Sequence, residues 1–161
     1  TITFHHLIFL SEERYNQHNN IFKGFYGMVC SDWKGFVRNS LPDIDVDFLI
    51  RKMEDIKKRS SKVKINFYPN FTDEEIRRYY TGFDFVSSGY GKRCLSPWMV
   101  SYIFPDGSVR PCQSLNFSAG NVKDSTFSKI WNNEKYMRFR KITKKEKKYP
   151  VCTRCTELYR F

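Results

Sequence analysis

Residues 94–112 have the sequence CLSPWMVSYIFPDGSVRPC, and we expect the rest of the chain to be arranged around them. The flanks, 98–104 and 109–112, are rich in aromatic and β-branched residues, which are typical of strands. In the FPDGS turn between them, proline sets φ for the first turn position and glycine tolerates a positive φ. The stretch therefore predicts a β-hairpin that brings Cys94 and Cys112 close together.

A second pair of cysteines lies near the C-terminus in residues 152–155, CTRC. A CxxC turn holds two thiolates at a spacing that both zinc sites and iron–sulfur clusters use. Zinc ribbons usually carry two such pairs, whereas this chain has one pair and two single cysteines. Single ligands from separate segments suit a larger cofactor, because the irons of a cubane cluster occupy separate corners. From the residues alone, zinc and a cluster remain equal alternatives, with disulfides or unligated thiols as a third.

Length and composition favour one globular domain, or one domain with a small appendage. The chain has 161 residues, of which 40% are hydrophobic and 17% aromatic, enough for a real core. No apolar run approaches the roughly 20 residues of a membrane-spanning helix, so we expect no membrane span.

The formal net charge of +11 raises nucleic acid as a partner, because cations that neutralise phosphates supply the sequence-independent part of such binding. Eight of the cations, however, fall between Lys135 and Lys148. A run of this kind is more often the solvated face of a helix and its trailing loop. Because no nucleic-acid-binding motif accompanies it, the sequence does not favour such a partner.

The count of five cysteines is odd, and Cys30 stands apart from the other four. No segment signals export, so we expect a cytoplasmic protein, in which a CxxC indicates metal or redox chemistry rather than disulfides. Cys30 is most simply a packed thiol. The alternative is a contact with the cofactor or the substrate.

Residues 1–10, TITFHHLIFL, form an apolar run of strand length. This pattern predicts a strand covered on both faces in a parallel α/β sheet. His5 and His6 point to opposite faces of such a strand, and we expect one packed and one hydrogen-bonded imidazole, the alternative being that one faces a substrate cavity. Residues 11–44 show no clean periodicity and predict a long, functional loop.

From Asp45 the pattern becomes helical, with an aspartate able to cap the first turn. Residues 63–68 then alternate between apolar and polar, which predicts a strand that stops at Pro69. Residues 72–75, TDEE, form a capping box that opens a short helix. In the helix predicted from Asp45, the apolar positions are Val46, Leu49, Ile50, Met53 and Ile56.

The order of these elements implies βα units with parallel pairing. We place a boundary near residue 88, where Gly89 and Gly91 mark a turn, and this divides the chain into residues 1–88 and 89–161.

Beyond the hairpin, the sequence predicts a turn at residues 120–121 and a short helix opened by the aspartate or serine at 124–125. An asparagine at 132–133 then caps a second helix. Pro150 ends that helix and leads into the CxxC pair.

The segments CLSPW, IFPDGSVRPC, GNV, FSKIWNNEKYMRFR and PVCTRC resemble, in this order, the SPASM/twitch-type auxiliary-cluster region of radical SAM enzymes. The resemblance implies one auxiliary 4Fe-4S cluster held by Cys94, Cys112, Cys152 and Cys155. It also implies that residues 1–88 are the last βα units of the partial parallel (β/α) barrel of that family. The expected fold is thus α/β, a C-terminal barrel piece followed by a small domain of a β-hairpin and helices around the cluster.

The chain departs from the family pattern in one respect that bears on activity. The CxxxCxxC motif of the cluster that cleaves S-adenosylmethionine is absent, so that cofactor and that cluster are expected only in a parent protein, and the fragment alone is not expected to be active. Cysteines for a second auxiliary cluster are also missing, which favours a single site. The catalytic residues are not identified by the sequence.

The resemblance implies a radical-based modification or oxidoreductase activity in the parent enzyme, with the auxiliary cluster supporting electron transfer or substrate positioning. Its partners would be a peptide or small-molecule substrate and a reductant such as a flavodoxin or ferredoxin. The alternative is a zinc-stabilised module for protein interaction or nucleic-acid binding.

Overall fold

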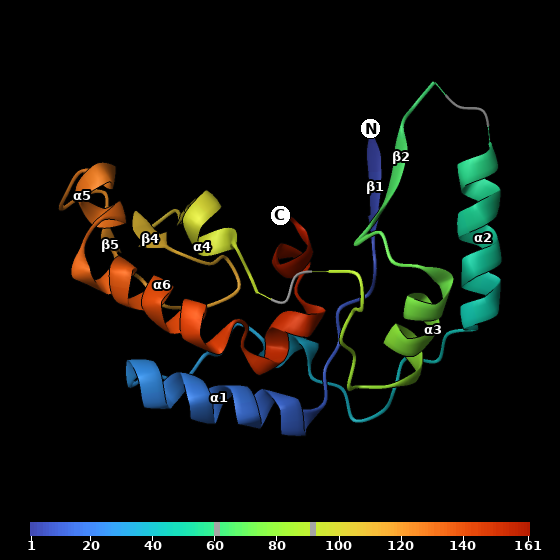
Figure 1. The fold of residues 1–161 in the computed structure, drawn as a ribbon, viewed down its shortest axis with the longest axis horizontal. Coiled ribbons are helices and arrows are strands. Elements are labelled where there is room, and N and C mark those ends of the chain that lie inside the picture. Colours follow the sequence, from blue (N-terminus) through green and yellow to red (C-terminus); the bar gives the residue numbers. More distant parts are fainter. Residues whose placement is uncertain (60–61, 91–92) are drawn as a thin grey trace.

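The computed structural model describes residues 1–59, 62–90 and 93–161 of the chain, so Gly91, one of the two glycines of the expected boundary, lies outside the described residues. The architecture is mixed α/β, with two small sheets and helices around them (Figure 1). Within the described part, no helix is both long and apolar enough to cross a membrane. The elements are β1 (Ile2–His5), α1 (Glu12–Tyr26), the 3-10 helix η1 (Lys34–Phe36), α2 (Val46–Lys58), β2 (Ile65–Tyr68), α3 (Asp73–Thr81), α4 (Ser96–Met99), β3 (Tyr102–Ile103), β4 (Ser108–Arg110), β5 (Gly120–Asn121), α5 (Phe127–Trp131), α6 (Glu134–Glu146), and the 3-10 helices η2 (Pro150–Arg154) and η3 (Thr156–Tyr159).

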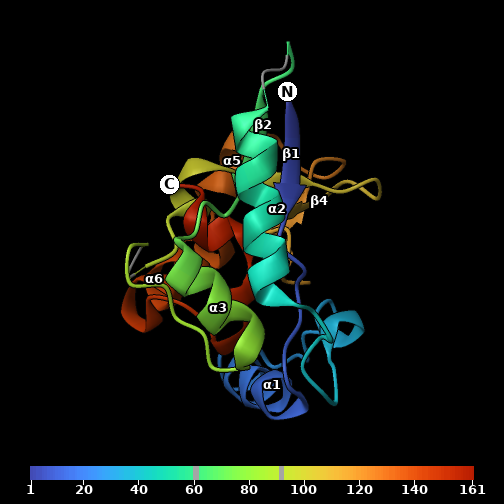
Figure 2. The same cartoon turned by 90° about the vertical axis from the view of Figure 1, so that its right-hand side faces the viewer.

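Strands β1 and β2 form a parallel two-stranded sheet, in which Ile2 is opposite Ile65 and His5 is opposite Tyr68. Helix α2 lies against one face of this pair (Figures 1 and 2). The expected parallel pairing is confirmed, and β2 ends directly before Pro69, as predicted.

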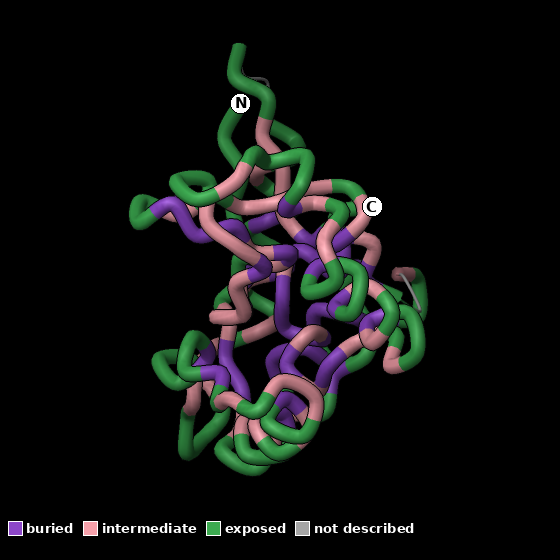
Figure 3. Tube along the Cα trace, turned by 90° about the vertical axis from the view of Figure 1, so that its left-hand side faces the viewer, coloured by how far each residue is buried: buried purple, intermediate pink, exposed green. Residues whose placement is uncertain are grey.

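Strand β1 differs from its expected burial. All four of its residues are exposed, with Ile2 at 48% and Phe4 at 44%, and Figure 3 shows this end of the chain as an exposed extension. The prediction of a strand covered on both faces is wrong, because every residue of β1 is exposed. Among the described residues, β2 is its one paired strand. Of the predicted run 1–10, Phe9 and Leu10 are buried, but they lie beyond the strand.

Helix α1 occupies residues expected to form a loop, so that prediction is also wrong. The Ser11 side chain accepts the N–H of Arg14 and caps the helix, and Gly27 ends it with a φ of 70°. His18 and Phe22, one turn apart, are its buried residues. These end signals are present in the sequence, but a run rich in Asn, His and Tyr obscures the narrow apolar face between them.

Helices α2 and α3 confirm the predicted helix starts. The Asp45 carboxylate accepts the N–H of Phe48, and Ile50 and Met53 are the buried positions of α2. Thr72 and Glu75 form the full capping box of α3. Local capping chemistry therefore sets where these two helices begin.

The second half contains the predicted antiparallel hairpin, but with a shorter first strand. Strand β3 pairs with β4 across a turn in which Gly107 has a φ of 86°. The prediction of a strand from Trp98 is wrong, because Ser96 and Pro97 begin the short helix α4 there, and proline favours the first turn of a helix.

Strand β5 pairs with β4 where a turn at residues 120–121 was expected, and the turn follows it instead. The cap residue of α5 is Thr126 rather than residue 124 or 125. Asn133, one of the two predicted cap residues, caps α6 by accepting a hydrogen bond from the N–H of Tyr136.

Buried side chains gather in the centre of the molecule in three clusters (Figure 3). One cluster joins Phe9, Tyr79 and Phe85 to Cys94 and Tyr159, so it draws on both sides of the expected boundary at residue 88. The division into residues 1–88 and 89–161 stays a prediction. The 3-10 helices η2 and η3 pass through the middle of the molecule (Figure 1).

Candidate metal centre

The hairpin region supplies two of the four candidate ligands. Cys94 precedes α4, is 8% exposed, and donates its backbone N–H to the Lys147 carbonyl at 3.0 Å. This bond ties the start of the segment to the end of α6. Cys112 follows β4 and is half-buried.

Of the CxxC pair, Cys152 lies in η2, and Cys155 connects η2 to η3. Pro150 occupies the first turn of η2, and the backbone N–H of Cys155 bonds to the Cys152 carbonyl at 3.0 Å. Cys155 is 5% exposed, whereas Cys152 is half-buried. The tight backbone therefore holds both cysteines on one rigid turn.

The four thiols share one buried neighbourhood. Burial raises the pKa of Cys94 to about 11, and burial raises the pKa values of Cys112 and Cys152 well above their usual range. In each case the other thiols raise the pKa further, and every pair among the four is involved. Four thiols that oppose one another's ionisation need a cationic partner before they can bind as thiolates.

Backbone N–H groups are placed to stabilise negative charge on the sulfurs. The N–H groups of Ser96, Ser114 and Glu157 lower the pKa values of the cysteines two residues before them. The Tyr149 N–H donates to the Cys152 Sγ at 3.3 Å. Sulfur ligands of iron clusters are tuned by such donors, so the residues present fit a thiolate-ligated metal cofactor.

Across residues 1–59, 62–90 and 93–161, no three His, Cys, Asp or Glu side chains are placed to hold a metal ion. The structure thus puts Cys94, Cys112, Cys152 and Cys155 in electrostatic range of one another, but no three of them are arranged around a single ion. Their assignment as ligands stays a prediction.

A buried carboxylate, which the sequence analysis missed, connects the segments that carry the cysteines. Glu157 accepts hydrogen bonds from the Ser96 hydroxyl at 3.0 Å, the Tyr102 hydroxyl at 2.6 Å and the Gln113 amide at 3.1 Å. Arg160 completes the set with an ion pair at 3.3 Å. Ser96 and Gln113 lie beside Cys94 and Cys112 in sequence, and Glu157 itself follows Cys155 by two residues. Glu157 therefore fixes these three segments relative to one another. No local pattern marks this glutamate.

Arg154, between the CxxC cysteines, points away from them. It is 2% exposed and donates to the backbone carbonyls of Tyr79, Gly82 and Phe83. Its guanidinium also lies 4.2 Å from the centre of the Phe9 ring. This arginine connects the CxxC turn to the N-terminal half instead of compensating charge on the thiols.

Cys30 is fully buried among apolar side chains, which confirms its interpretation as a packed thiol. Its Sγ lies 3.9 Å from the Ser114 carbonyl, so it approaches the candidate centre through one intervening residue.

His6 is buried against three aromatic rings and hydrogen-bonded to the Tyr80 hydroxyl at 3.2 Å, whereas His5 is exposed. The packing and the hydrogen bond, which were expected on one histidine each, are therefore both found on His6. Both histidines also border a pocket of about 190 Å³ beside Phe4. Whether that pocket binds a substrate stays a prediction.

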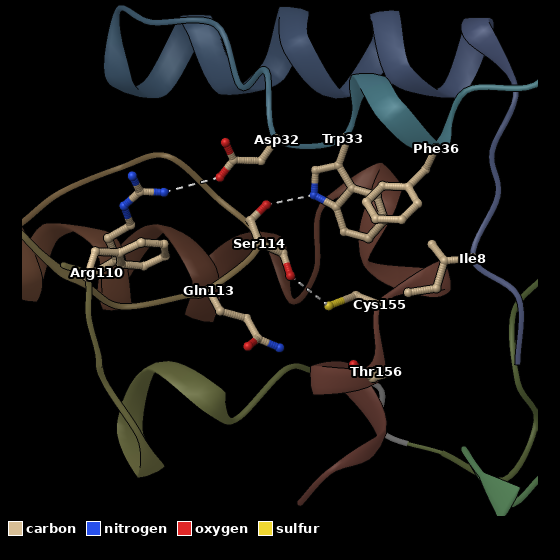
Figure 4. Close-up of a pocket in the computed structure, with 10 residues that line it drawn as sticks. Ile8, Asp32, Trp33, Phe36, Arg110, Gln113, Ser114, Cys155 and Thr156 are labelled. Carbon is tan, nitrogen blue, oxygen red and sulfur yellow. Dashed lines mark hydrogen bonds and ion pairs between the residues drawn. The ribbon is translucent and has the colours of Figure 1, made fainter. Parts of the chain in front are cut away.

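A larger pocket, of about 640 Å³, opens directly beside Cys155 (Figure 4). Its walls combine the aromatic rings of Trp33, Phe36 and Phe104 with an ion pair between Arg110 and Asp32 at 3.2 Å. The segment between α1 and α2 supplies three of these residues. The aromatic residues of this segment were the sequence signal that could have indicated the pocket.

Comparison with protein-family models gives one match: residues 94–156 correspond to SPASM, an iron–sulfur cluster-binding domain. No curated protein and no solved structure matches the chain. The family match confirms the resemblance drawn from the cysteine-bearing segments. Residues 94–156 therefore form a SPASM-type iron–sulfur cluster-binding domain.

Proposed function

We propose that this domain binds one auxiliary 4Fe-4S cluster through Cys94, Cys112, Cys152 and Cys155, as the cluster-bearing part of a radical SAM enzyme. The observation that carries the proposal is that four thiols from three separate segments inside the SPASM match lie in electrostatic range of one another. The backbone N–H donors beside each sulfur support it.

Ligands drawn from separate segments favour a cubane cluster over a single zinc ion, because the cluster offers four spaced irons. An iron–sulfur cluster supplies one-electron chemistry when bound. With a cysteine for each iron, no coordination position is left for a substrate. Electron transfer or substrate positioning therefore fits this site better than direct ligation of the substrate.

The proposal extends to a parent protein. The parallel β1–β2 pair with its exposed apolar side chains supports a partial (β/α) barrel that further strands would complete. The S-adenosylmethionine and the cluster that cleaves it would belong to that parent, together with a peptide or small-molecule substrate. A flavodoxin or ferredoxin would supply electrons, in a reducing compartment such as the cytoplasm.

The deciding experiment is metal analysis of the chain produced and reconstituted without oxygen. We expect about four irons and four sulfides per chain, with the broad visible absorbance of a cluster. Zinc in place of iron would replace the proposal with a zinc-stabilised module. Each single Cys→Ala variant at the four positions should lose iron, whereas Cys30→Ala is the matched control because it removes a buried thiol outside the set. Equal iron in all five variants would overturn the ligand assignment.

A further inference from the structure

Ser114 lies at the junction of the cysteine site and the large pocket (Figure 4). It follows Cys112 by two residues, on the chain that leaves β4. Its hydroxyl, its N–H and its carbonyl all interact with other residues. Each of the three groups faces a different part of the site.

The two donors of Ser114 act on two different cysteines. Its Oγ lies 3.5 Å from the Cys155 Sγ, and its backbone N–H interacts with the Cys112 thiol. A thiolate bound to metal carries no proton, so in the loaded site the hydroxyl must be the donor to Cys155. Ser114 thereby contacts one sulfur from the hairpin side and one from the CxxC pair.

The carbonyl of Ser114 fixes the orientation of these donors. It accepts the indole N–H of Trp33 at 2.7 Å and lies 3.9 Å from the Cys30 Sγ. Both partners are buried and come from the segment that follows α1. This anchoring from a distant part of the chain keeps the hydroxyl of Ser114 directed at Cys155.

We infer that Ser114 is a positioning residue that holds two of the cysteine ligands and raises the reduction potential of the cluster. Hydrogen bonds to ligand sulfurs favour the more negative, reduced state, and so raise the potential. The inference rests on the proposed function, because it requires a cluster at these cysteines. It adds Ser114 as a residue that adjusts the reduction potential of that cluster.

The test is a potentiometric titration of the reconstituted chain, followed by visible absorbance and electron paramagnetic resonance. Ser114→Ala should keep its iron and shift the midpoint potential to more negative values, so that the ratio of reduced to oxidised cluster at a fixed potential falls about tenfold. Ser114→Thr retains the hydroxyl and should restore the wild-type potential. Trp33→Phe, which removes the anchoring N–H, should give a smaller shift in the same direction.

Ser118→Ala is the matched control, because that hydroxyl donates to the Gly120 carbonyl instead of a cysteine. A Ser114→Ala potential equal to that of wild type and of Ser118→Ala, at full iron content, would overturn the inference while leaving the proposed function intact. If Ser114→Ala fails to retain iron, Ser114→Thr decides: a wild-type potential supports the inference, and loss of iron contradicts it. Absence of a cluster in the wild-type chain would instead refute the proposed function.

Discussion

The cysteine region and the β1–β2 pair are both rich in apolar residues, yet they differ in how much of that surface is covered. Around the cysteines, Glu157, Arg154 and Ser114 each connect segments far apart in sequence, and Cys94 and Cys155 are buried. In the sheet, β1 has one neighbouring strand and its side chains stay exposed. The difference shows that apolar composition does not by itself bury a segment. Contacts from several distant segments do.

The largest effect is expected when a candidate ligand is removed from the cysteine region. Cys112→Ala or Cys155→Ala should remove most of the bound iron and lower the free energy of unfolding of the loaded chain by several kcal/mol, because metal binding to separated segments is coupled to folding. Iron analysis and thermal unfolding of the anaerobic protein measure both effects. A variant that has lost its iron and still unfolds at the temperature of the loaded wild-type chain would contradict this coupling.

Two phenylalanines that differ in burial test the comparison between the two regions. Phe9 is fully buried, whereas Phe4 in β1 is 44% exposed and contacts only the Phe67 ring among the described aromatic pairs. Phe9→Ala should cost about 3–5 kcal/mol, and Phe4→Ala about 1 kcal/mol or less. Urea denaturation of both variants gives the free energies of unfolding. Equal costs would mean that β1 is covered in solution.

Loss of the buried carboxylate tests the connection between the ligand segments. Glu157→Ala leaves the Ser96 and Tyr102 hydroxyls and the Gln113 amide without their acceptor, and should cost about 2–4 kcal/mol. Glu54→Ala, which removes an exposed ion pair with Lys58, should change stability by about 0.5 kcal/mol or less. Denaturant unfolding of the two variants, side by side, gives the comparison, and a cost for Glu157→Ala as small as that of the control would show that the site does not depend on this connection.

The smallest effect concerns pH and compares two buried histidines, His6 directly after β1 and His18 in α1, whose ring packs against Tyr149. Burial lowers the pKa of His6 in the N-terminal half, and that of His18 in α1, from 6.5 to about 4. Since the unfolded state binds the proton more readily between these values, each histidine favours folding above about pH 6.5, and this contribution is lost as the pH falls toward 4.

We expect each histidine to account for about 2–3 kcal/mol of that loss. His18→Leu and His6→Leu should flatten the pH dependence of the unfolding midpoint between pH 6.5 and 4. An unchanged slope in either variant would show that the corresponding histidine takes up its proton without unfolding.

Sequence patterns located several local features correctly, although they missed the start of α4 at Ser96 and the cap of α5 at Thr126. The caps at Asp45, Thr72 and Asn133 set the starts of α2, α3 and α6, and Gly107 sets the hairpin turn. Patterns failed where the deciding partner was distant. Helix α1 was missed because its buried face is narrow. His18 on that face packs against Tyr149, which lies 131 residues further along the chain, so its burial cannot be read from the local sequence.

For the candidate site, the sequence by itself supplied the candidate ligands: four cysteines that lie within the SPASM match at residues 94–156. Only the tertiary structure decided what surrounds them, namely Glu157 between the ligand segments, Ser114 against Cys155, and the pocket walled by Trp33. The physical reason is the range of the forces. Capping and turn formation act within a few residues, whereas burial and the convergence of side chains depend on segments whose separation along the chain no local pattern encodes.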